Sequence, residues 1–301
     1  MVGLCEGRVC IVTGAGRGIG REHSLMLAAH GAKIVVNDLG GTMDGTGSAE
    51  GPAHDVVREI QALGGEAVAN TDDISDWGGA EKLVNQAVEA FGRLDVLVNN
   101  AGILRDRMLT NMSEAEWDAV IKVHLKGTAG PSHFAAAHWR ERSKAGDEVD
   151  GRIINTSSPS GIYGNVGQTN YGAAKAGIAA FTIIASMELE RYGVTVNAIA
   201  PAALTRMTEN LGMGQVPDEV KEQMSPRWIA PIITWLASAE SKTVTGRVFD
   251  VSGQALSVSE GWHRGPTVTP VLDPTLIGPL VEQLMAEARP NADMSGRDRA
   301  S

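Results

Sequence analysis

Cysteine is scarce in this sequence: Cys5 and Cys10 are the only two among 301 residues. Two thiols are too few for a disulfide framework or a four-ligand zinc site, so we expect neither a disulfide-stapled fold nor a metal. Cys10 lies within an apolar run, where a small buried thiol is favoured over a reactive one. A reducing, cytoplasmic compartment is therefore the default expectation.

An excess of positive charge and long apolar runs are also missing. Lys and Arg total 26 against 36 Asp and Glu, and this net charge of −10 argues against nucleic acid and anionic membranes as partners. No charged segment followed by an apolar one opens the chain, so no secretory signal is predicted. The longest apolar stretch, residues 176–187, contains Thr182 and Ser186 and is too short to span a bilayer. With 43% apolar and 21% charged residues, the composition is that of a soluble globule and excludes intrinsic disorder.

Glycine, by contrast, is abundant: 36 of 301 residues, without the repeating period of collagen, which indicates tight backbone turns. Short β-branched runs alternate with Ala-rich helical segments. The runs CIVT, IVV, VLV and RIIN are apolar at consecutive positions, as in a parallel sheet covered on both faces. The predicted fold class is therefore α/β, a doubly wound (Rossmann) parallel sheet of about seven strands with helices on both faces, in a single domain. The predicted strands are 8–13, 33–37, 67–70, 96–99, 152–156, 195–200 and 248–251, and the predicted helices are 18–30, 53–63, 77–91, 114–137, 171–192, 229–237 and 276–289.

Three segments interrupt this alternation. Residues 40–51 form a Gly-rich loop, residues 204–227 have weak periodicity, and a tail follows Gly253. We expect residues 1–253 to form the domain, with 204–227 as a substrate lid, and residues 254–301 to form a partly mobile C-terminal extension.

The first predicted strand is followed by a glycine-rich turn, TGAGRGIG at residues 13–20, which also opens the first helix. Glycines there allow backbone to approach a pyrophosphate, which is stabilised by the helix N-terminus. A tight turn without a ligand would give the same glycines, but the second strand ends in Asp38, 18 residues beyond Gly20. A carboxylate at that point accepts hydrogen bonds from ribose hydroxyls, so a dinucleotide site is predicted.

This glycine spacing, with NNAG at residues 99–102, SS at 157–158, YGAAK at 171–175 and VNAIAP at 196–201, resembles the short-chain dehydrogenase/reductase family. The resemblance covers about residues 5–253. Within the family, the stretches VVNDLGG, VHLKG and APxxxTRMT look like the (3R)-hydroxyacyl-CoA dehydrogenase branch, which is also called type 4 17β-hydroxysteroid dehydrogenase. The tail after Gly253 does not clearly follow that branch.

A catalytic set follows from this resemblance. Tyr171 and Lys175 are four residues apart, so they share one helix face, and we expect the Lys175 ammonium to lower the pKa of the phenol. The pair alone is a common accident of amphipathic helices, but it stands 13 residues after Ser158, which follows a buried strand. The resemblance implies that Ser158 hydrogen-bonds the substrate oxygen, Tyr171 transfers the proton, and Lys175 also holds the nicotinamide ribose. Ser157 and Ser160 lie close in the sequence, but the 13-residue spacing selects Ser158 as the catalytic serine.

The sequence departs from the family pattern at His124, where an asparagine usually anchors a relay water. A neutral imidazole both donates and accepts, so His124 either takes that role or is a packed helix residue. His133 and His138 are assigned to packing, and Trp77, Trp117 and Trp139 to the core or its rim.

Other cofactor positions come from the same matching. Met207, Leu211, Met213 and Met224 suit an adaptable apolar lid, or simply a packed loop. The positions that the resemblance assigns to the dinucleotide, beside Tyr171 and Lys175, are Gly14, Arg17, Gly18, Ile19, Gly20, Asp38, Asp73, Ile74, Asn100, Ala101, Gly102, Pro201 and Thr205.

The predicted function is an oxidoreductase that moves hydride between NAD and a secondary alcohol or ketone. The resemblance implies a hydrophobic small-molecule substrate, either a 3-hydroxyacyl thioester or a hydroxysteroid. Asp38 favours NAD, whereas Arg17 is a position where a basic residue often accompanies NADP. The apolar helix from Tyr171 indicates a homodimer or homotetramer. The alternative is a non-catalytic dinucleotide sensor, which would need only the glycine loop.

Overall fold

The computed structural model describes residues 3–41, 51–204 and 217–298. Most of the predicted Gly-rich loop, and residues 205–216 of the predicted lid with Thr205, Met207, Leu211 and Met213, lie outside these ranges.

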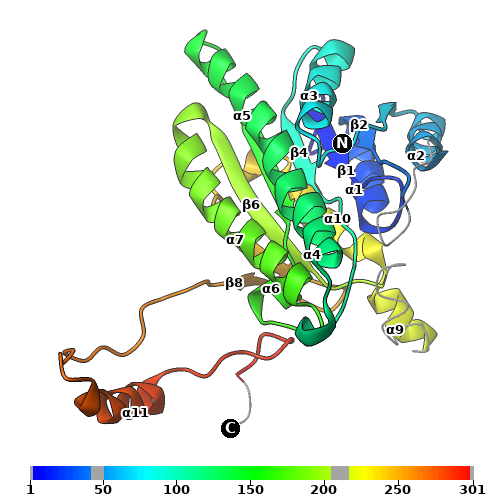
Figure 1. Cartoon of the computed structure of the whole chain (residues 1–301). Helices are drawn as coiled ribbons and strands as arrows, with labels where there is room; N and C mark the ends of the chain where they lie inside the picture. The colour runs from blue at the N-terminus through cyan, green and yellow to red at the C-terminus, as the bar shows by residue number, and fades with distance from the viewer. Residues whose placement is uncertain (1–2, 42–50, 205–216, 299–301) are drawn as a thin grey trace.

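One sheet of eight strands forms the centre of the molecule, in the order β3-β2-β1-β4-β5-β6-β7-β8 (Figure 1). The first seven strands are parallel, which confirms the predicted doubly wound fold, and the direction of winding reverses between β1 and β4. The parallel strands are β1 Val9–Thr13, β2 Lys33–Asn37, β3 Glu66–Asn70, β4 Val96–Asn99, β5 Gly151–Thr156, β6 Val194–Pro201 and β7 Val248–Val251.

The eighth strand was not predicted. β8, Leu256–Ser259, pairs antiparallel with β7 and lies within the segment expected to be an extension. Leu256 is 60% exposed, so this edge strand gains little from apolar burial and is held by hydrogen bonds to its neighbour. A strand stabilised in that way has no apolar run that marks it in the sequence.

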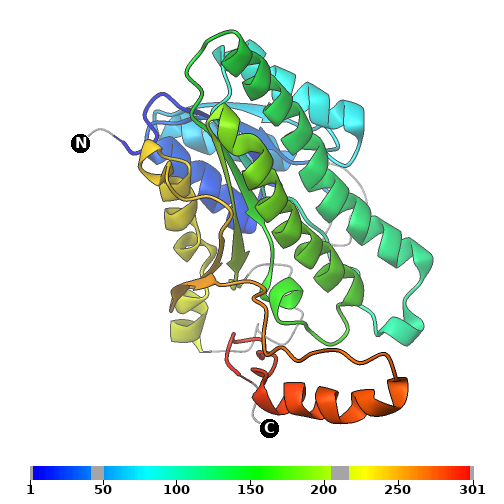
Figure 2. The same cartoon turned by 90° about the vertical axis from the view of Figure 1, so that its left-hand side faces the viewer.

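Helices cover both faces of the sheet, as Figure 2 shows. The two largest apolar cores among the described residues lie one under each helix layer, and Cys5 and Cys10 are both buried in the first. One layer holds α1 Gly18–Ala29, α2 Gly51–Ala62 and α10 Ala230–Leu236, and the other holds α3 Trp77–Phe91, α5 Gly127–Lys144 and α7 Thr169–Leu189.

The helix predicted over residues 114–137 is divided into three parts. A capping box between Ser113 and Glu116 begins α4, Glu114–Ile121. A π-helical turn, Lys122–Lys126, follows, and α5 then continues to Lys144. Such turns are frequent at functional sites, and this one contains His124.

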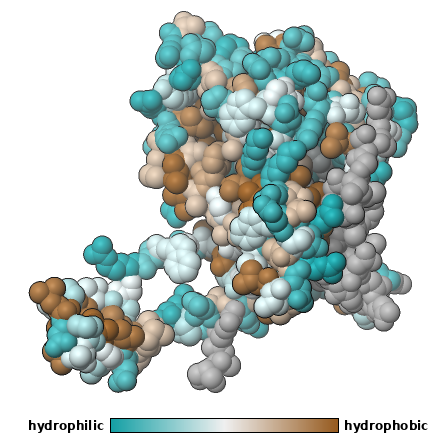
Figure 3. Space-filling view, viewed as in Figure 1, coloured by the Kyte–Doolittle hydropathy of each residue, from teal (hydrophilic) through white to brown (hydrophobic). Residues whose placement is uncertain are grey.

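The C-terminal segment leaves the body after β8. Its helix α11, Ile277–Glu287, lies apart from the sheet and its helix layers, and carries exposed apolar residues (Figures 1 and 3). The chain then returns, so that Gly296 lies beside the ring of Tyr163 near the short helix α6, Pro159–Ile162. One further short helix, α9 Asp218–Gln223, follows the residues outside the described ranges.

One helix in the described part of the chain, Thr169–Tyr192, is long and apolar enough to cross a membrane by length and composition. The same segment packs on β6 and carries Tyr171 and Lys175, as a core helix of this fold does. It therefore gives no clear membrane span.

Candidate active site

The glycine turn after β1 is fitted closely against the end of β4. Gly14 has a φ of +61°, and a Cβ there would lie 2.7 Å from the Cα of Ala101. The Asn100 amide donates to the carbonyls of Thr13 at 3.0 Å and Gly14 at 3.1 Å, and the Thr13 hydroxyl accepts from the Asn100 backbone at 3.0 Å. These contacts hold the turn open at the carboxyl edge of the sheet, where the winding reverses.

Asp38, the residue directly after β2, faces this turn. Its Oδ2 accepts from the backbone nitrogen of Gly16 at 2.8 Å, and its Oδ1 accepts from that of Gly40 at 2.7 Å. The Arg17 side chain is exposed, and the ion pairs between described residues do not include one from Arg17 to Asp38. A dinucleotide requires a glycine turn whose backbone approaches the pyrophosphate and a carboxylate that accepts from the ribose hydroxyls. The glycine turn and Asp38 provide both, so these residues fit that cofactor.

The remaining predicted cofactor positions lie along the same edge. Asp73 Oδ1 accepts from the backbone nitrogen of Ser75 at 2.8 Å and from its hydroxyl at 2.6 Å. Ile74 is 7% exposed and packs within the apolar core, so its side chain is directed inward. Pro201 ends β6. Gly18, Ile19 and Gly20 form the first turn of α1, and Ala101 and Gly102 follow β4.

Ser158, Tyr171 and Lys175 come together from two elements. Ser158 follows β5 at the start of α6, and its side chain lies close enough to that of Tyr171 on α7 to affect the pKa of the phenol. The Nζ of Lys175 lies 5.6 Å from the centroid of the Tyr171 ring and donates to the Thr156 carbonyl at 2.6 Å. All three lie at the carboxyl edge of the sheet that the glycine turn also occupies.

The two neighbouring serines have other partners. The Ser157 hydroxyl donates to the carbonyl of Lys175 at 2.8 Å, and the Ser160 hydroxyl donates to the side chain of Gln168 at 2.7 Å. The backbone nitrogen of Ser160 donates to Ser158 Oγ at 3.2 Å. Ser158 is thus the serine whose side chain is directed at Tyr171.

Burial controls the protonation of this pair. It raises the pKa of Tyr171 to about 12, although the hydrogen bond from Ser158 opposes the rise. It lowers the pKa of Lys175 to about 7, because a buried ammonium loses hydration. Our expectation that Lys175 lowers the pKa of the phenol is therefore wrong for the chain by itself, where burial is the largest influence on Tyr171.

His124 contacts Tyr171 directly. The two rings meet edge to face with centroids 5.1 Å apart, and a Cβ on Gly102 would lie 2.4 Å from His124 Cε1. Nε2 lies 2.8 Å from the carbonyl oxygen and 3.1 Å from the nitrogen of Ile103, while Nδ1 is buried without a partner among the described residues. Burial and the nearby Lys175 lower the pKa of His124 to about 3, so the imidazole is neutral at physiological pH.

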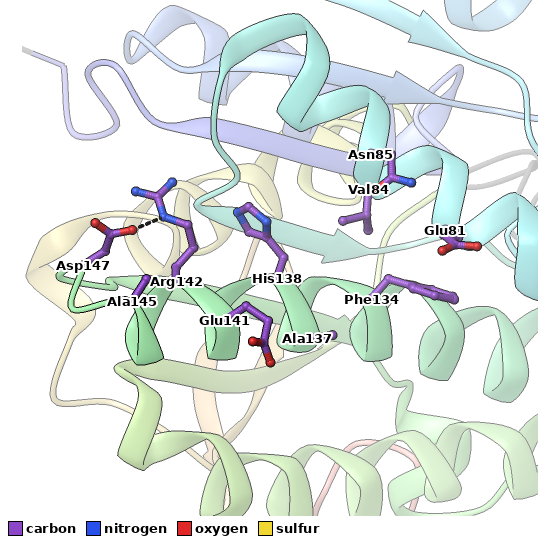
Figure 4. Close-up of a pocket in the computed structure, with 10 residues that line it drawn as sticks. All are labelled: Glu81, Val84, Asn85, Phe134, Ala137, His138, Glu141, Arg142, Ala145 and Asp147. Carbon is purple, nitrogen blue, oxygen red and sulfur yellow. Dashed lines mark hydrogen bonds and ion pairs between the residues drawn. The ribbon is translucent and has the colours of Figure 1, made fainter.

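The residues assigned to packing lie on the helices α3, α4 and α5. Trp139 is buried, whereas Trp77 and Trp117 are partly exposed at the rim. His138 lines a shallow hollow between α3 and α5, shown in Figure 4, which contains none of the predicted site residues. His133 packs against the Trp77 ring at 5.1 Å.

Sequence reasoning missed the polar side chains that hold the site in place. Asn99 donates to Asn155 and Asn155 donates to Thr182, both at 2.9 Å, which ties β4 and β5 to α7. The available signal was an asparagine at or near the end of two otherwise apolar strands. Asp106 and Gln168, which also connect to α7, carried no such signal.

Known proteins share this arrangement of fold and motifs. A family model described as short chain dehydrogenase matches residues 8–215. The hydroxyacyl-CoA dehydrogenase ChsB1 of Mycobacterium tuberculosis is 43% identical over 305 aligned positions, which cover 97% of this chain and 93% of that protein. The peroxisomal multifunctional enzyme type 2 of Drosophila melanogaster is 43% identical over 268 positions, which cover 89% of this chain but 43% of the longer fly protein. Among solved structures, a short chain dehydrogenase from Mycobacterium avium is 52% identical and superposes with a TM-score of 0.87 over 97% of this chain and 99% of that one.

Proposed function

The chain belongs to the short-chain dehydrogenase family, and on this premise we propose that it transfers hydride between NAD and a 3-hydroxyacyl thioester. As a member of this family it is an oxidoreductase, which confirms the resemblance predicted from its motifs. The observation that carries the proposal is the placement of the Tyr171 phenol near Ser158, with the Nζ of Lys175 5.6 Å from the centroid of its ring, at the dinucleotide edge of the sheet.

The proton chemistry is assigned to four side chains. The nicotinamide, when bound, supplies or accepts the hydride. Ser158 donates a hydrogen bond to the substrate oxygen, and Tyr171 gives its proton to that oxygen in reduction or takes it in oxidation. Lys175 stabilises the phenolate and holds the nicotinamide ribose. His124, neutral beside the Tyr171 ring, continues the proton path through its unpartnered Nδ1.

NAD is proposed over NADP because of Asp38. Its carboxylate is fixed by two backbone donors beside the glycine turn, where it accepts from ribose hydroxyls and repels an added phosphate. The dinucleotide positions are those matched from the family, from Gly14 to Pro201. Thr205, outside the described residues, completes the set.

The substrate class is supported by two observations. The M. tuberculosis relative of nearly equal length is named a hydroxyacyl-CoA dehydrogenase. Apolar side chains are also exposed on the loops that flank the site: Met108 is 54% exposed, Leu109 65% and Val166 83%. A hydroxysteroid, the other candidate from the sequence, would use the same apolar surface. A lid over residues 204–227 is part of this proposal.

A homodimer or homotetramer and a cytoplasmic location are also proposed. The outward face of α7 exposes Ile183, Ile184 and Met187, between 44% and 67% each, and this stripe suits contact with a second copy (Figure 3). The alternative of a non-catalytic sensor is not retained, because the chain is an oxidoreductase.

The test is NADH absorbance during turnover of a panel of 3-hydroxyacyl thioesters and steroid alcohols. Tyr171→Phe is expected to keep NAD affinity near wild type and to lower turnover by orders of magnitude, because only the proton-transferring hydroxyl is lost. Tyr192→Phe, in the 3-10 turn Glu190–Tyr192 just beyond the distant end of α7, is the matched control and retains turnover. A Tyr171→Phe enzyme with more than a tenth of wild-type turnover would contradict the role of Tyr171 in proton transfer. If the enzyme turned over only the steroid alcohols, the proposed 3-hydroxyacyl thioester substrate would be replaced by a hydroxysteroid.

A further inference from the structure

Asp106 lies in the loop after β4 and reaches the start of α7 through Gln168. Its Oδ2 accepts from Gln168 Nε2 at 2.7 Å, and the two residues are 62 positions apart in the chain. Oδ1 of Asp106 is buried and has no hydrogen-bond partner among the described residues. The nearby backbone strengthens this connection, since Arg107 donates to the carbonyl of Gly167 at 2.9 Å.

The carboxylate determines which way the Gln168 amide points. A carboxylate only accepts hydrogen bonds, so the amide nitrogen of Gln168 must face Asp106 and its oxygen must face the other side. That oxygen accepts from the Ser160 hydroxyl at 2.7 Å and from the Asn165 amide at 2.9 Å. Gln168 is 6% exposed, so water offers it few alternative partners.

Gln168 in turn contacts Ser160 and Gly172, which are neighbours of Ser158 and Tyr171. Through Ser160, whose backbone nitrogen donates to Ser158 Oγ at 3.2 Å, it fixes the serine. Its own carbonyl accepts from the backbone nitrogen of Gly172 at 2.6 Å, next to Tyr171. A displaced Gln168 side chain would therefore loosen Ser160 and, through it, Ser158, and it would disturb the start of the helix that carries Tyr171.

Asp106 also acts on Tyr171 by its charge. Burial raises the pKa of Asp106 and the hydrogen bond from Gln168 opposes the rise, while the Asp106 carboxylate raises the pKa of Tyr171. The other ionisable groups that face Tyr171 are Lys175 and the neutral His124. On the Asp106 side the neighbouring charges in the loop are Arg105 and Arg107, and Arg107 pairs with Glu116 of α4 at 3.0 Å.

We propose that Asp106 is a positioning residue for Tyr171 and Ser158, acting through Gln168, whose amide it orients. The inference rests on the proposed role of Tyr171 in proton transfer. The negative charge of Asp106 adds a direction to this positioning: it favours the phenol form of Tyr171, which carbonyl reduction requires, over the phenolate, which alcohol oxidation requires.

Two variants separate position from charge. Asp106→Asn keeps an oxygen that accepts from Gln168 and removes the charge, whereas Asp106→Ala removes both. At the pH of maximal alcohol oxidation, Asp106→Ala is expected to lower kcat about tenfold with the KM for NAD unchanged, and Asp106→Asn to stay within about threefold of wild type. Asp118→Asn, which removes an exposed carboxylate from α4, is the matched control and keeps wild-type kcat.

The pH profile of kcat supplies a measurement that a purely structural role would not change. The acid limb of alcohol oxidation is expected to move to lower pH by about half a unit in both Asp106 variants, and not in Asp118→Asn, because a negative charge near the phenol is lost. An unmoved limb in Asp106→Asn, or wild-type kcat in Asp106→Ala, would overturn the proposal. If Asp106→Ala does not fold, the limb of Asp106→Asn decides alone.

Failure of this inference is distinguishable from failure of the proposed function. Retained turnover in Tyr171→Phe refutes the function, whereas an inactive Tyr171→Phe with an unmoved Asp106→Asn profile refutes only the role of Asp106. A readout without substrate is also available, because the chain has three tyrosines. Alkaline titration of tyrosinate absorbance in the NAD complex, minus the same titration of Tyr171→Phe, isolates Tyr171. Its midpoint is expected to fall in Asp106→Asn, and an unchanged midpoint counts against the proposal.

Discussion

His23 provides a measurable link between burial and acid stability. It lies on α1 with a side chain that is 0% exposed, and neither ring nitrogen has a hydrogen-bond partner among the described residues. Burial lowers its pKa from 6.5 to about 3, because the apolar surroundings disfavour the imidazolium. Between these two values the unfolded chain binds a proton that the folded protein does not bind. Stability therefore rises with pH in this window and is lost as the pH falls below about 6.5.

The size of the loss in stability follows from the difference between the two pKa values of the histidine. A histidine whose pKa is about 6.5 when unfolded and far lower when folded contributes roughly 1.4 kcal/mol of destabilisation between pH 7.5 and 5.5. His124, whose pKa is also lowered to about 3, contributes a similar amount. We expect His23→Leu to reduce the loss between the two pH values by about 1.4 kcal/mol, because leucine binds no proton in either state.

Urea unfolding followed by circular dichroism at both pH values, at one protein concentration, measures this difference. Comparison of each variant with itself across pH removes any packing effect of leucine. The control is His263→Leu, an exposed histidine of the C-terminal segment, which should lose as much stability as wild type. If His23→Leu loses as much stability as wild type, His23 does not bind its proton on unfolding and the reasoning is refuted.

Two further predictions concern the site. The wild-type enzyme should prefer NAD over NADP at least tenfold in kcat/KM, about 1.4 kcal/mol, and Asp38→Ala should narrow or reverse that ratio; equal use of both coenzymes by wild type would mean that Arg17 prevails. His124→Asn should retain turnover within a few-fold, since an amide also donates and accepts, whereas His124→Ala should lose clearly more activity. Steady-state rates of the three proteins test this, and equal rates would make His124 a packing residue.

Most of the fold could be predicted because burial leaves a direct trace in the sequence. The ranges expected for the strands β2, β4 and β7 are those observed, since parallel strands covered on both faces are apolar at consecutive positions. The range expected for the helix α3 is also the one observed. Two of the elements that were not predicted, β8 and the π-helical turn, have a different origin. β8 is held by backbone hydrogen bonds at an edge, and the π-helical turn at His124 depends on one additional residue within a helix, which leaves the apolar pattern on either side intact.

In the candidate site, too, the residues that could be predicted are those that leave a local pattern in the sequence. Tyr171 and Lys175 are predictable because four residues on a helix define one face, and Ser158 because it follows a buried strand at a fixed distance in the chain. Asp106 and Gln168 meet across 62 residues, and only the folded loop after β4 brings them within 2.7 Å. A carboxylate and an amide in two polar loops carry no periodicity, so nothing local indicates that one orients the other. Residues that react with substrate are therefore easier to identify in this sequence than residues that hold them in position. The positioning contacts have to be sought in the structure, among polar side chains that are buried.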